Sequence, residues 1–241
     1  MFITPLFFIA ALLYSSVGHG GASAYLAVMS LAGLAPESMR PAALILNILV
    51  SSITLYKFYR AKAFSWQLLI PLVIASIPCA FLGGLITLPT QIYKPIIGIV
   101  LIIAAWQVFS RANLSYEVST KSVSRPALLG LGAGLGLLSG LTGVGGGIFL
   151  SPLLLLLKWA ETRVISGVAS AFILVNSISG LAGVLTKSPQ LPDGMAYWAV
   201  AAIAGGLLGS EWGSRRLATP SIRKLLALVL VLAGAKMLIS G

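Results

Sequence analysis

Two glycine-rich stretches inside otherwise apolar sequence carry the clearest chemical signal of the chain. Gly18-His19-Gly20-Gly21 interrupts one long apolar segment, and Gly143-Val144-Gly145-Gly146-Gly147 interrupts another. Glycine permits a tight turn and lets backbone N–H groups approach a ligand closely. A helix that follows such a turn presents unpaired N–H groups and the positive end of its dipole, which suits an anion. The two stretches predict an anion site between two turns; the alternative is that they only permit close helix packing.

Neutral hydrogen-bonding side chains lie near both turns in the sequence. Neutral donors suit a transported anion, because a fully charged partner would hold the anion too tightly for release. The polar candidates for a substrate site are Asn47, Ser139, Thr142, Ser170 and Asn176. Ordinary hydrogen bonds between membrane helices are the simpler explanation for each single serine.

His19 is the only histidine, and it lies within the first glycine stretch, where the second stretch has Val144. An ionisable side chain inside a membrane is a functional candidate by default, and histidine titrates near neutral pH. We therefore expect His19 to be a candidate for proton coupling, with a capping or packing role as the alternative. One histidine and one cysteine, Cys79, cannot assemble a common zinc site, so we expect no metal and no cofactor.

The composition is that of a membrane protein. Of the 241 residues, 58% are hydrophobic and 9% are charged, whereas soluble domains carry about 25% charged residues. Lys and Arg number 16 against 5 Asp and Glu. With this hydropathy we expect the basic residues beside membrane spans, facing an anionic inner leaflet, rather than on a nucleic acid. The N-terminal stretch lacks the basic region of a cleavable signal peptide, so we expect it to belong to the membrane domain.

Apolar segments follow one another along the chain with short polar connections. The sequence predicts eight of them, at residues 2–34, 41–59, 66–88, 94–110, 126–158, 164–186, 194–214 and 220–240. The first and fifth are the long ones that glycine interrupts, and the other six have the length of single spans. The two long segments begin about 125 residues apart, which predicts an internal duplication. The predicted repeats cover residues 1–110 and 126–241, and residues 111–125 connect them.

The distribution of Lys and Arg distinguishes two arrangements of the long segments. If each long segment crossed the membrane once, the basic residues would divide equally between the sides, which the positive-inside rule does not favour. If each is a re-entrant hairpin, twelve basic residues gather on one side and four on the other. The twelve are Lys57, Arg60, Lys62, Arg111, Lys121, Arg125, Lys158, Arg163, Arg215, Arg216, Arg223 and Lys224, and the four are Arg40, Lys94, Lys187 and Lys236.

The uneven split favours re-entrant hairpins and determines the predicted fold class. We expect an all-α integral membrane protein of two inverted repeats, each a glycine-broken re-entrant helical hairpin plus three transmembrane helices. Both termini would then lie outside the cell. Kinked or tilted single crossings remain the alternative for the two long segments. Glu211 is the only acidic residue expected in hydrocarbon, and Arg215, one turn later, is its predicted partner.

At the glycine motifs the sequence resembles the sulfite exporter TauE/SafE family of permeases. The resemblance is carried by Gly143-Val144-Gly145-Gly146-Gly147-Ile148-Phe149-Leu150-Ser151-Pro152, by Gly167-Val168-Ala169-Ser170 and, more loosely, by the first glycine stretch. Family members show G-x-G-G-G-x-x-x-x-P in both halves, but here Ala22 replaces the third consecutive glycine and Ala27 the proline. The resemblance implies transport of sulfite, sulfonates or related sulfur-containing anions across a bacterial cytoplasmic membrane.

The expected function is therefore that of a small-anion permease and not of an enzyme. The residues at 18–21 and 143–147 would line a midplane site used in alternating access, with the anion and the lipid bilayer as partners. A passive channel and a membrane subunit that transports nothing remain alternatives, and no oligomeric state is indicated. An intramembrane serine hydrolase built on Ser139 and His19 is the third alternative, although Leu137 stands where such enzymes have glycine. No nucleotide-binding loop occurs in the sequence.

Overall fold

The computed structural model describes residues 3–110, 124–157, 159–187, 190–215, 230–231 and 234–239, and within these ranges it contains helices and no strand. The prediction of an all-α protein is confirmed for this part of the chain. The helices are α1 Thr4–Ser15, α2 Ala22–Leu31, α3 Pro36–Arg60, α4 Trp66–Leu85, α5 Thr90–Ser110, α6 Arg125–Thr142, α7 Gly147–Leu156, α8 Thr162–Leu185 and α9 Met195–Arg215. The predicted segment 220–240 lies largely outside the described residues.

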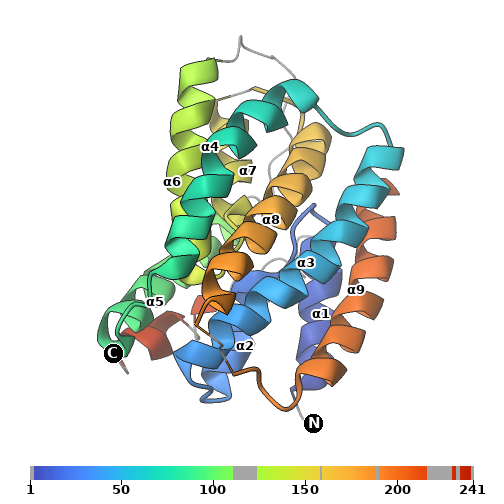
Figure 1. Cartoon of the computed structure of the whole chain (residues 1–241). Helices are drawn as coiled ribbons and strands as arrows, with labels where there is room; N and C mark the ends of the chain where they lie inside the picture. Colours follow the sequence, from blue (N-terminus) through green and yellow to red (C-terminus); the bar gives the residue numbers. More distant parts are fainter. Residues whose placement is uncertain are drawn as a thin grey trace.

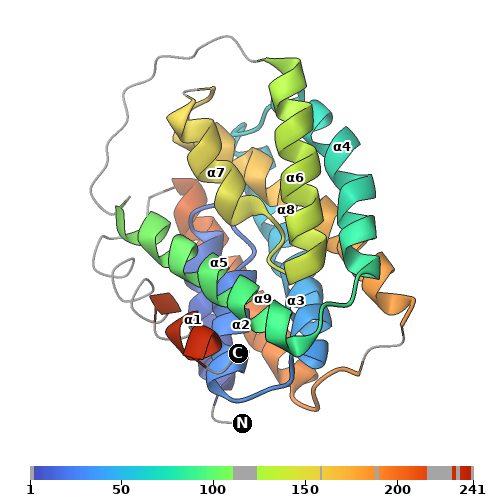
Figure 2. The same ribbon diagram turned by 90° about the vertical axis from the view of Figure 1, so that its left-hand side faces the viewer.

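The two long apolar segments are each broken into a pair of helices that run in opposite directions. α1 rises from the end of the molecule where the N-terminus lies, and α2 returns toward that end (Figures 1 and 2). α6 descends from the opposite end, and α7 returns to it. The chain therefore reverses at both glycine stretches, and the tips of the two hairpins meet in the interior of the bundle.

The longer helices pack beside these hairpins, α4 against α6 and α9 against α1. α3 and α9 run upward in Figure 1, whereas α4 and α8 run downward. By length and composition α3, α4 and α8 are apolar enough to cross a membrane. Large apolar side chains point outward from several helices, and Ile74, Trp106 and Val200 are each more than 60% exposed. Such a surface is compatible with a surrounding lipid phase.

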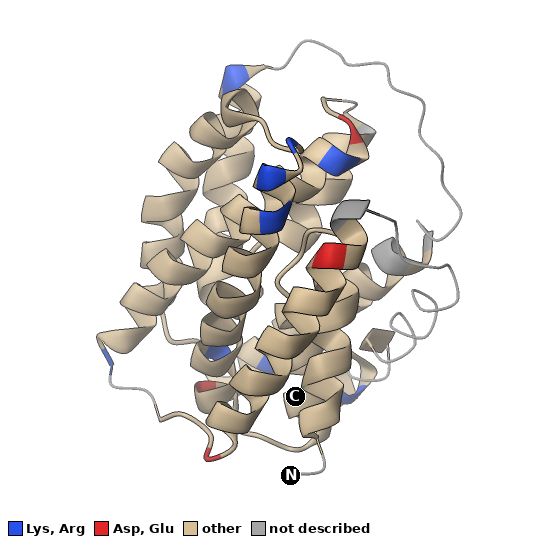
Figure 3. Cartoon of the chain, turned by 90° about the vertical axis from the view of Figure 1, so that its right-hand side faces the viewer, with Lys and Arg blue, Asp and Glu red and all other residues tan. Residues whose placement is uncertain are grey.

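Charged residues lie mainly toward the two ends of the bundle, and few of them lie in its middle (Figure 3). The ten described Lys and Arg positions fall into two groups according to the helix end on which they lie. The upper group is Lys57, Arg60, Lys62, Arg125, Arg163 and Arg215, and the lower group is Arg40, Lys94, Lys187 and Lys236. The other six basic residues lie outside the described residues.

Two charged side chains form contacts between helices. Arg40 is buried on α3, and its guanidinium donates to the Ile86 carbonyl at 2.8 Å and to the Gly83 carbonyl at 2.6 Å. A cation at the C-terminal end of α4 complements the negative end of that helix dipole. Glu211 on α9 pairs with Lys57 on α3. The side chain of Arg215, its predicted partner, lies outside what the structure describes.

Small residues allow α4, α6 and α8 to pack backbone against backbone. On α6, Gly132, Gly136 and Gly140 follow one another at intervals of one helical turn. A Cβ built on any of the three would overlap a carbonyl oxygen of α4, belonging to Leu72, Ser76 and Ala80 respectively. Gly180 on α8 joins the same contact, because its built Cβ would lie 3.3 Å from Cα of Gly140. Close approach of this kind is the main source of helix association in lipid.

This packing predicts that Gly136→Val destabilises the protein. The valine must displace the backbone of α4, and such overpacking costs about 1–3 kcal/mol or more. Gly134→Val is the matched control, because Gly134 is on the same helix and nothing lies within 4 Å of its built Cβ. The measurement is the thermal midpoint of the detergent-purified protein, followed by size-exclusion chromatography. An equal loss in both variants would contradict the proposed α4–α6 contact.

Candidate functional site

Both glycine turns use backbone conformations that other residues rarely adopt. Gly18 and Gly21 have φ of +86° and +99° in the first turn, and Gly143, Gly145 and Gly146 have φ of +80°, +81° and +73° in the second. Gly21 and Gly146 are the residues that immediately precede α2 and α7, respectively. Each of the two short helices thus begins at a left-handed glycine, which a residue with a Cβ would strain.

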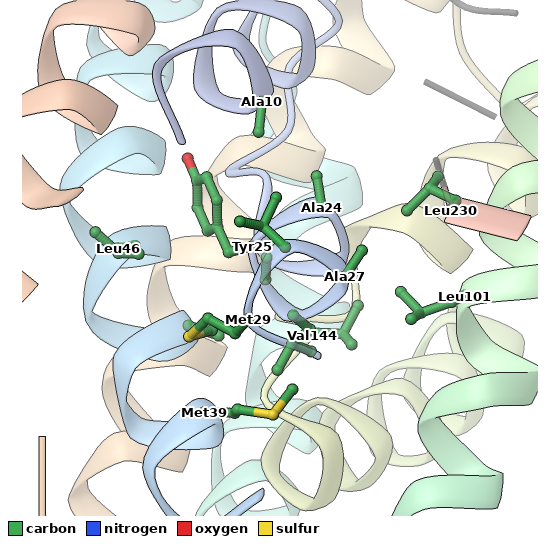
Figure 4. Close-up of a cluster of buried hydrophobic side chains, with 14 of the residues drawn as sticks. Ala10, Ala24, Tyr25, Ala27, Met29, Met39, Leu46, Leu101, Val144 and Leu230 are labelled. Carbon is green, nitrogen blue, oxygen red and sulfur yellow. The ribbon is translucent and has the colours of Figure 1, made fainter. Parts of the chain in front are cut away.

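The two turns meet at the same two side chains, Asn47 of α3 and Ile173 of α8. A Cβ built on Gly20 would overlap Oδ1 of Asn47 and lie 3.2 Å from Cγ2 of Ile173. A Cβ built on Gly145 would overlap Nδ2 of Asn47 and lie 3.0 Å from Cγ2 of Ile173. Stretches that are far apart in the sequence therefore close around one shared centre. Val144 of the second turn also packs with Met29 of α2 and with Met39 (Figure 4).

The carboxamide of Asn47 holds the two turns together. The side chain is fully buried, and its Oδ1 accepts a hydrogen bond of 3.1 Å from the N–H of Ala22, the first residue of α2. Its Nδ2 donates to the carbonyl of Val144 and to Oγ of Ser177, both at 3.3 Å. Asn47 thus caps the helix of the first turn and binds the backbone of the second. The sequence predicted Asn47 as a substrate ligand, but in this structure all of these contacts are with the protein itself.

The N-terminus of α7 has no corresponding cap. Ile173 packs against its first residue, Gly147, and an isoleucine side chain cannot accept a hydrogen bond. Phe149 and Leu150 donate their N–H groups to the Gly146 carbonyl, both at 3.2 Å. Among the described residues the N–H groups of Gly147 and Ile148 have no acceptor. A helix end with open donors inside a protein is a site that an anion can satisfy.

Two buried side chains, Ser139 of α6 and Asn176 of α8, have unused polar atoms, and Ser139 lies beside the turn that precedes α7. Ser139 is fully buried, and its Cβ would be 3.5 Å from a Cβ built on Gly146. The hydroxyl of Ser139 has no hydrogen-bond partner among the described residues. Asn176 is also fully buried; its Nδ2 donates to the Phe172 carbonyl at 2.7 Å, and its Oδ1 has no partner within the described part of the chain. Buried polar atoms without partners are uncommon in folded proteins and point to a ligand or to water.

His19 connects the first turn to α7. Its Nδ1 lies 3.0 Å from the carbonyl of Val17, and its Nε2 lies 3.1 Å from the carbonyl of Gly147. Nε2 is also 3.1 Å from Oγ of Ser151. A carbonyl oxygen only accepts, so the ring can donate to both carbonyls only when it is doubly protonated. The edge of the Tyr14 ring faces the imidazole, with ring centroids 6.4 Å apart.

Two other predicted hydroxyls are already used by the protein. Thr142 donates to the Leu138 carbonyl at 2.6 Å and accepts from the N–H of Val144 at 3.3 Å, so it stabilises the second turn. Ser170 donates to the Gly167 carbonyl at 2.7 Å within α8. The structure therefore brings together both glycine turns, His19, Asn47 and Ser139, and it assigns hydrogen bonds within the protein to Thr142 and Ser170.

The sequence did not indicate three residues that shape the site. Ile173 gives no signal because isoleucine is ordinary in an apolar segment. Tyr25 lies with its ring against Gly21, 2.7 Å from a built Cβ, and its buried hydroxyl has no partner among the described residues. Tyr14 accepts a hydrogen bond of 2.7 Å from Ser23. The two tyrosines flank the first glycine stretch. Aromatic side chains with hydroxyl groups on both sides of this stretch were the sequence feature that could have indicated them as site residues.

Comparison with known proteins gives a consistent picture. The family model described as "Sulfite exporter TauE/SafE" matches residues 3–237. The chain is 37% identical to the "Probable membrane transporter protein y4hK" of Sinorhizobium fredii over 235 residues, which cover 96% of this chain and 95% of that protein. It is 27% identical to the "Probable membrane transporter protein MJ0441" of Methanocaldococcus jannaschii over 143 residues, 58% of this chain and 53% of that one. No solved structure matches. These matches confirm the resemblance seen at the glycine motifs: the chain is a membrane transporter that belongs to the sulfite exporter TauE/SafE family.

Proposed function

We propose that this transporter moves a small sulfur-containing anion, such as sulfite or a small sulfonate, by alternating access around a site between its two glycine turns. The observation that carries the proposal is the open N-terminus of α7 together with the neighbouring Ser139, whose buried hydroxyl has no partner among the described residues. These groups are neutral donors with the positive end of a helix dipole behind them. Such a site attracts an oxyanion without the tight charge pair that would prevent its release.

The direction of the helices supports an arrangement of two inverted repeats. The first hairpin, α1 and α2, opens toward the lower end of the bundle in Figure 1, and the second hairpin, α6 and α7, opens toward the upper end. α3 and α8 follow their hairpins and run in opposite directions. Transporters built from inverted repeats expose a central site to each side in turn by moving one unit against the other. We propose that both hairpins are re-entrant and that the repeats cover residues 1–110 and 126–241.

The charge distribution supports a location in a bacterial cytoplasmic membrane, with the upper end of the bundle in the cytoplasm. The upper group of basic residues is the larger of the two described groups, and the six remaining basic residues belong to segments expected on the same side. Cytoplasmic loops carry the excess of Lys and Arg in membrane proteins. Both termini would then lie on the outer side of the membrane.

The contacts of His19 favour transport over hydrolysis. A serine nucleophile needs a base within hydrogen-bond reach of its hydroxyl. The hydrogen bonds described for the ring of His19 go to Val17, Gly147 and Ser151, and none of them goes to Ser139. A membrane subunit that transports nothing would not require two broken helices that meet at one buried centre. We therefore retain His19 as the proposed proton carrier of a transport cycle.

Labelling of single cysteines tests the proposed topology. In a Cys79→Ser background, Ser124→Cys and Glu161→Cys precede and follow the second hairpin, and Ser38→Cys lies at the opposite end of the bundle. A membrane-impermeant maleimide applied to intact cells should label the Ser38→Cys variant alone, and in inverted vesicles it should label the other two. A single crossing of residues 126–158 would place the positions at 124 and 161 on opposite sides, which would exclude the re-entrant hairpin.

Flux measurements in liposomes test the anion site. The wild-type protein should give saturable flux of sulfite or methanesulfonate that competing anions inhibit. Ser139→Ala should raise KM about 10-fold or more, because a hydrogen bond to a charged group contributes about 1.5–3 kcal/mol.

Gly145→Val should abolish flux, because the valine side chain would overlap Nδ2 of Asn47 and because residue 145 has a positive φ. Ser52→Ala is the control, since the Ser52 hydroxyl donates to Ile48 within α3 on an exposed face. Wild-type kinetics in both site variants would refute the site.

The pH dependence of flux tests the role of His19. A pH gradient across the liposome should drive anion accumulation by the wild-type protein if protonation of His19 accompanies anion binding. His19→Gln keeps a polar side chain that cannot be doubly protonated, so this variant should still exchange the anion but lose accumulation driven by the gradient. Accumulation that is equal in the variant and the wild type would remove His19 from the coupling mechanism.

A further inference from the structure

Resting on the function proposed above, we propose that the chain binds one anion, at the N-terminus of α7, because the carboxamide of Asn47 permanently occupies the equivalent place on α2. The two helices each have ten residues and begin immediately after a left-handed glycine. Judged by backbone alone, they would offer two equivalent anion sites. The side chains that face the first residue of each helix make the sites different.

The contacts show that Asn47 and Ile173 hold corresponding positions in the two halves. Each comes from the long helix that follows its hairpin, α3 or α8, and each lies against the first residue of its short helix, Ala22 or Gly147. Both are also packed against the preceding turn of the opposite half. The chain therefore has an amide at this position in the first half and a hydrocarbon in the second.

Asn47 cannot easily leave its place on α2. Its Oδ1 carries the partial negative charge that an anion would otherwise supply to the N–H of Ala22. Its Nδ2 is held by Val144 and Ser177, so displacement would break hydrogen bonds on both sides of a fully buried amide. An unpaired polar group costs much more inside a dry interior than in water. In the first half, Oδ1 of Asn47 thus takes the place that a bound anion would have at the first N–H of α2.

Ile173 leaves the N–H of Gly147, the counterpart of the Ala22 N–H, without an acceptor, and this first donor is where the two helices differ, since the second N–H, of Ser23 or Ile148, has no acceptor among the described residues in either half. The N–H groups of Gly147 and Ile148 have no acceptor among the described residues, and Ser139, whose Cβ lies beside Gly146, has an unpartnered hydroxyl. An oxyanion has several acceptor oxygens and can accept from backbone and hydroxyl donors together. The departure of the first half from the family motif, with Ala22 in place of glycine, falls at the residue that Asn47 caps.

Equilibrium binding to the purified wild-type protein gives the first test. Titration with methanesulfonate, monitored by isothermal calorimetry, should give a stoichiometry of one anion per chain, and Ser139→Ala should weaken this binding about 10-fold. Two anions per chain would overturn the assignment to α7 alone, whether or not any variant folds. Failure of methanesulfonate, sulfite and other small anions to bind at all would instead refute the proposed function.

Exchange of the two side chains gives the second test. Ile173→Asn places an amide where it can cap Gly147, and the affinity for methanesulfonate should fall at least 10-fold in a protein that remains folded by size-exclusion chromatography. Ile178→Asn is the matched control, because the same substitution on the same helix falls on a side chain that is 50% exposed. Unchanged affinity in a folded Ile173→Asn variant would overturn the inference while leaving the proposed function intact.

Discussion

The structure depends on satisfying backbone hydrogen-bonding groups where two chain reversals meet inside a nonaqueous interior. Irregular backbone at this depth is tolerated only when the protein itself, a ligand or a water-filled cavity surrounds it. Asn47 meets part of this requirement for both reversals, because its carboxamide accepts from the first residue of α2 and donates to the carbonyl of Val144. One polar side chain at the centre of the molecule thus forms hydrogen bonds with both halves. The backbone N–H groups of α7 that it does not reach define the candidate site.

The surrounding packing explains why this centre can be held in place. α4, α6 and α8 approach so closely that glycines on one helix face carbonyl oxygens on the next. Arg40 adds a fixed charge at the C-terminal end of α4, and Cγ of the same side chain would lie 3.1 Å from a Cβ built on Gly143. The second hairpin is thus anchored to α4 along its first helix and at its turn.

The sequence predicted the helical class, the positions of both breaks and the family, because these follow from strong local signals. The clustered glycines at 18–21 and 143–147 disfavour a continuous helix, and the helices end and restart at these residues. The sequence could not predict which glycine turn is capped by a side chain and which is left open. That difference depends on which side chains of α3 and α8 face each turn. Asn47 and Asn176 are both polar candidates in the sequence, but the position equivalent to Asn47 in space is occupied by Ile173.

The same geometry suggests how a proton and an anion would influence each other. His19 belongs to the first turn but lies against the carbonyl of Gly147, whose N–H has no acceptor among the described residues and belongs to the proposed anion site. A doubly protonated ring would place a positive charge beside Gly147, next to an anion bound at the start of α7. Each charge would then reduce the cost of burying the other. Linkage of this kind is reciprocal, so an anion that favours protonation of His19 must be bound more tightly when His19 is protonated. Under the proposed mechanism, coupling would then require no separate proton pathway through the helices, because the first hairpin holds His19 against the first residue of α7, where the anion is proposed to bind.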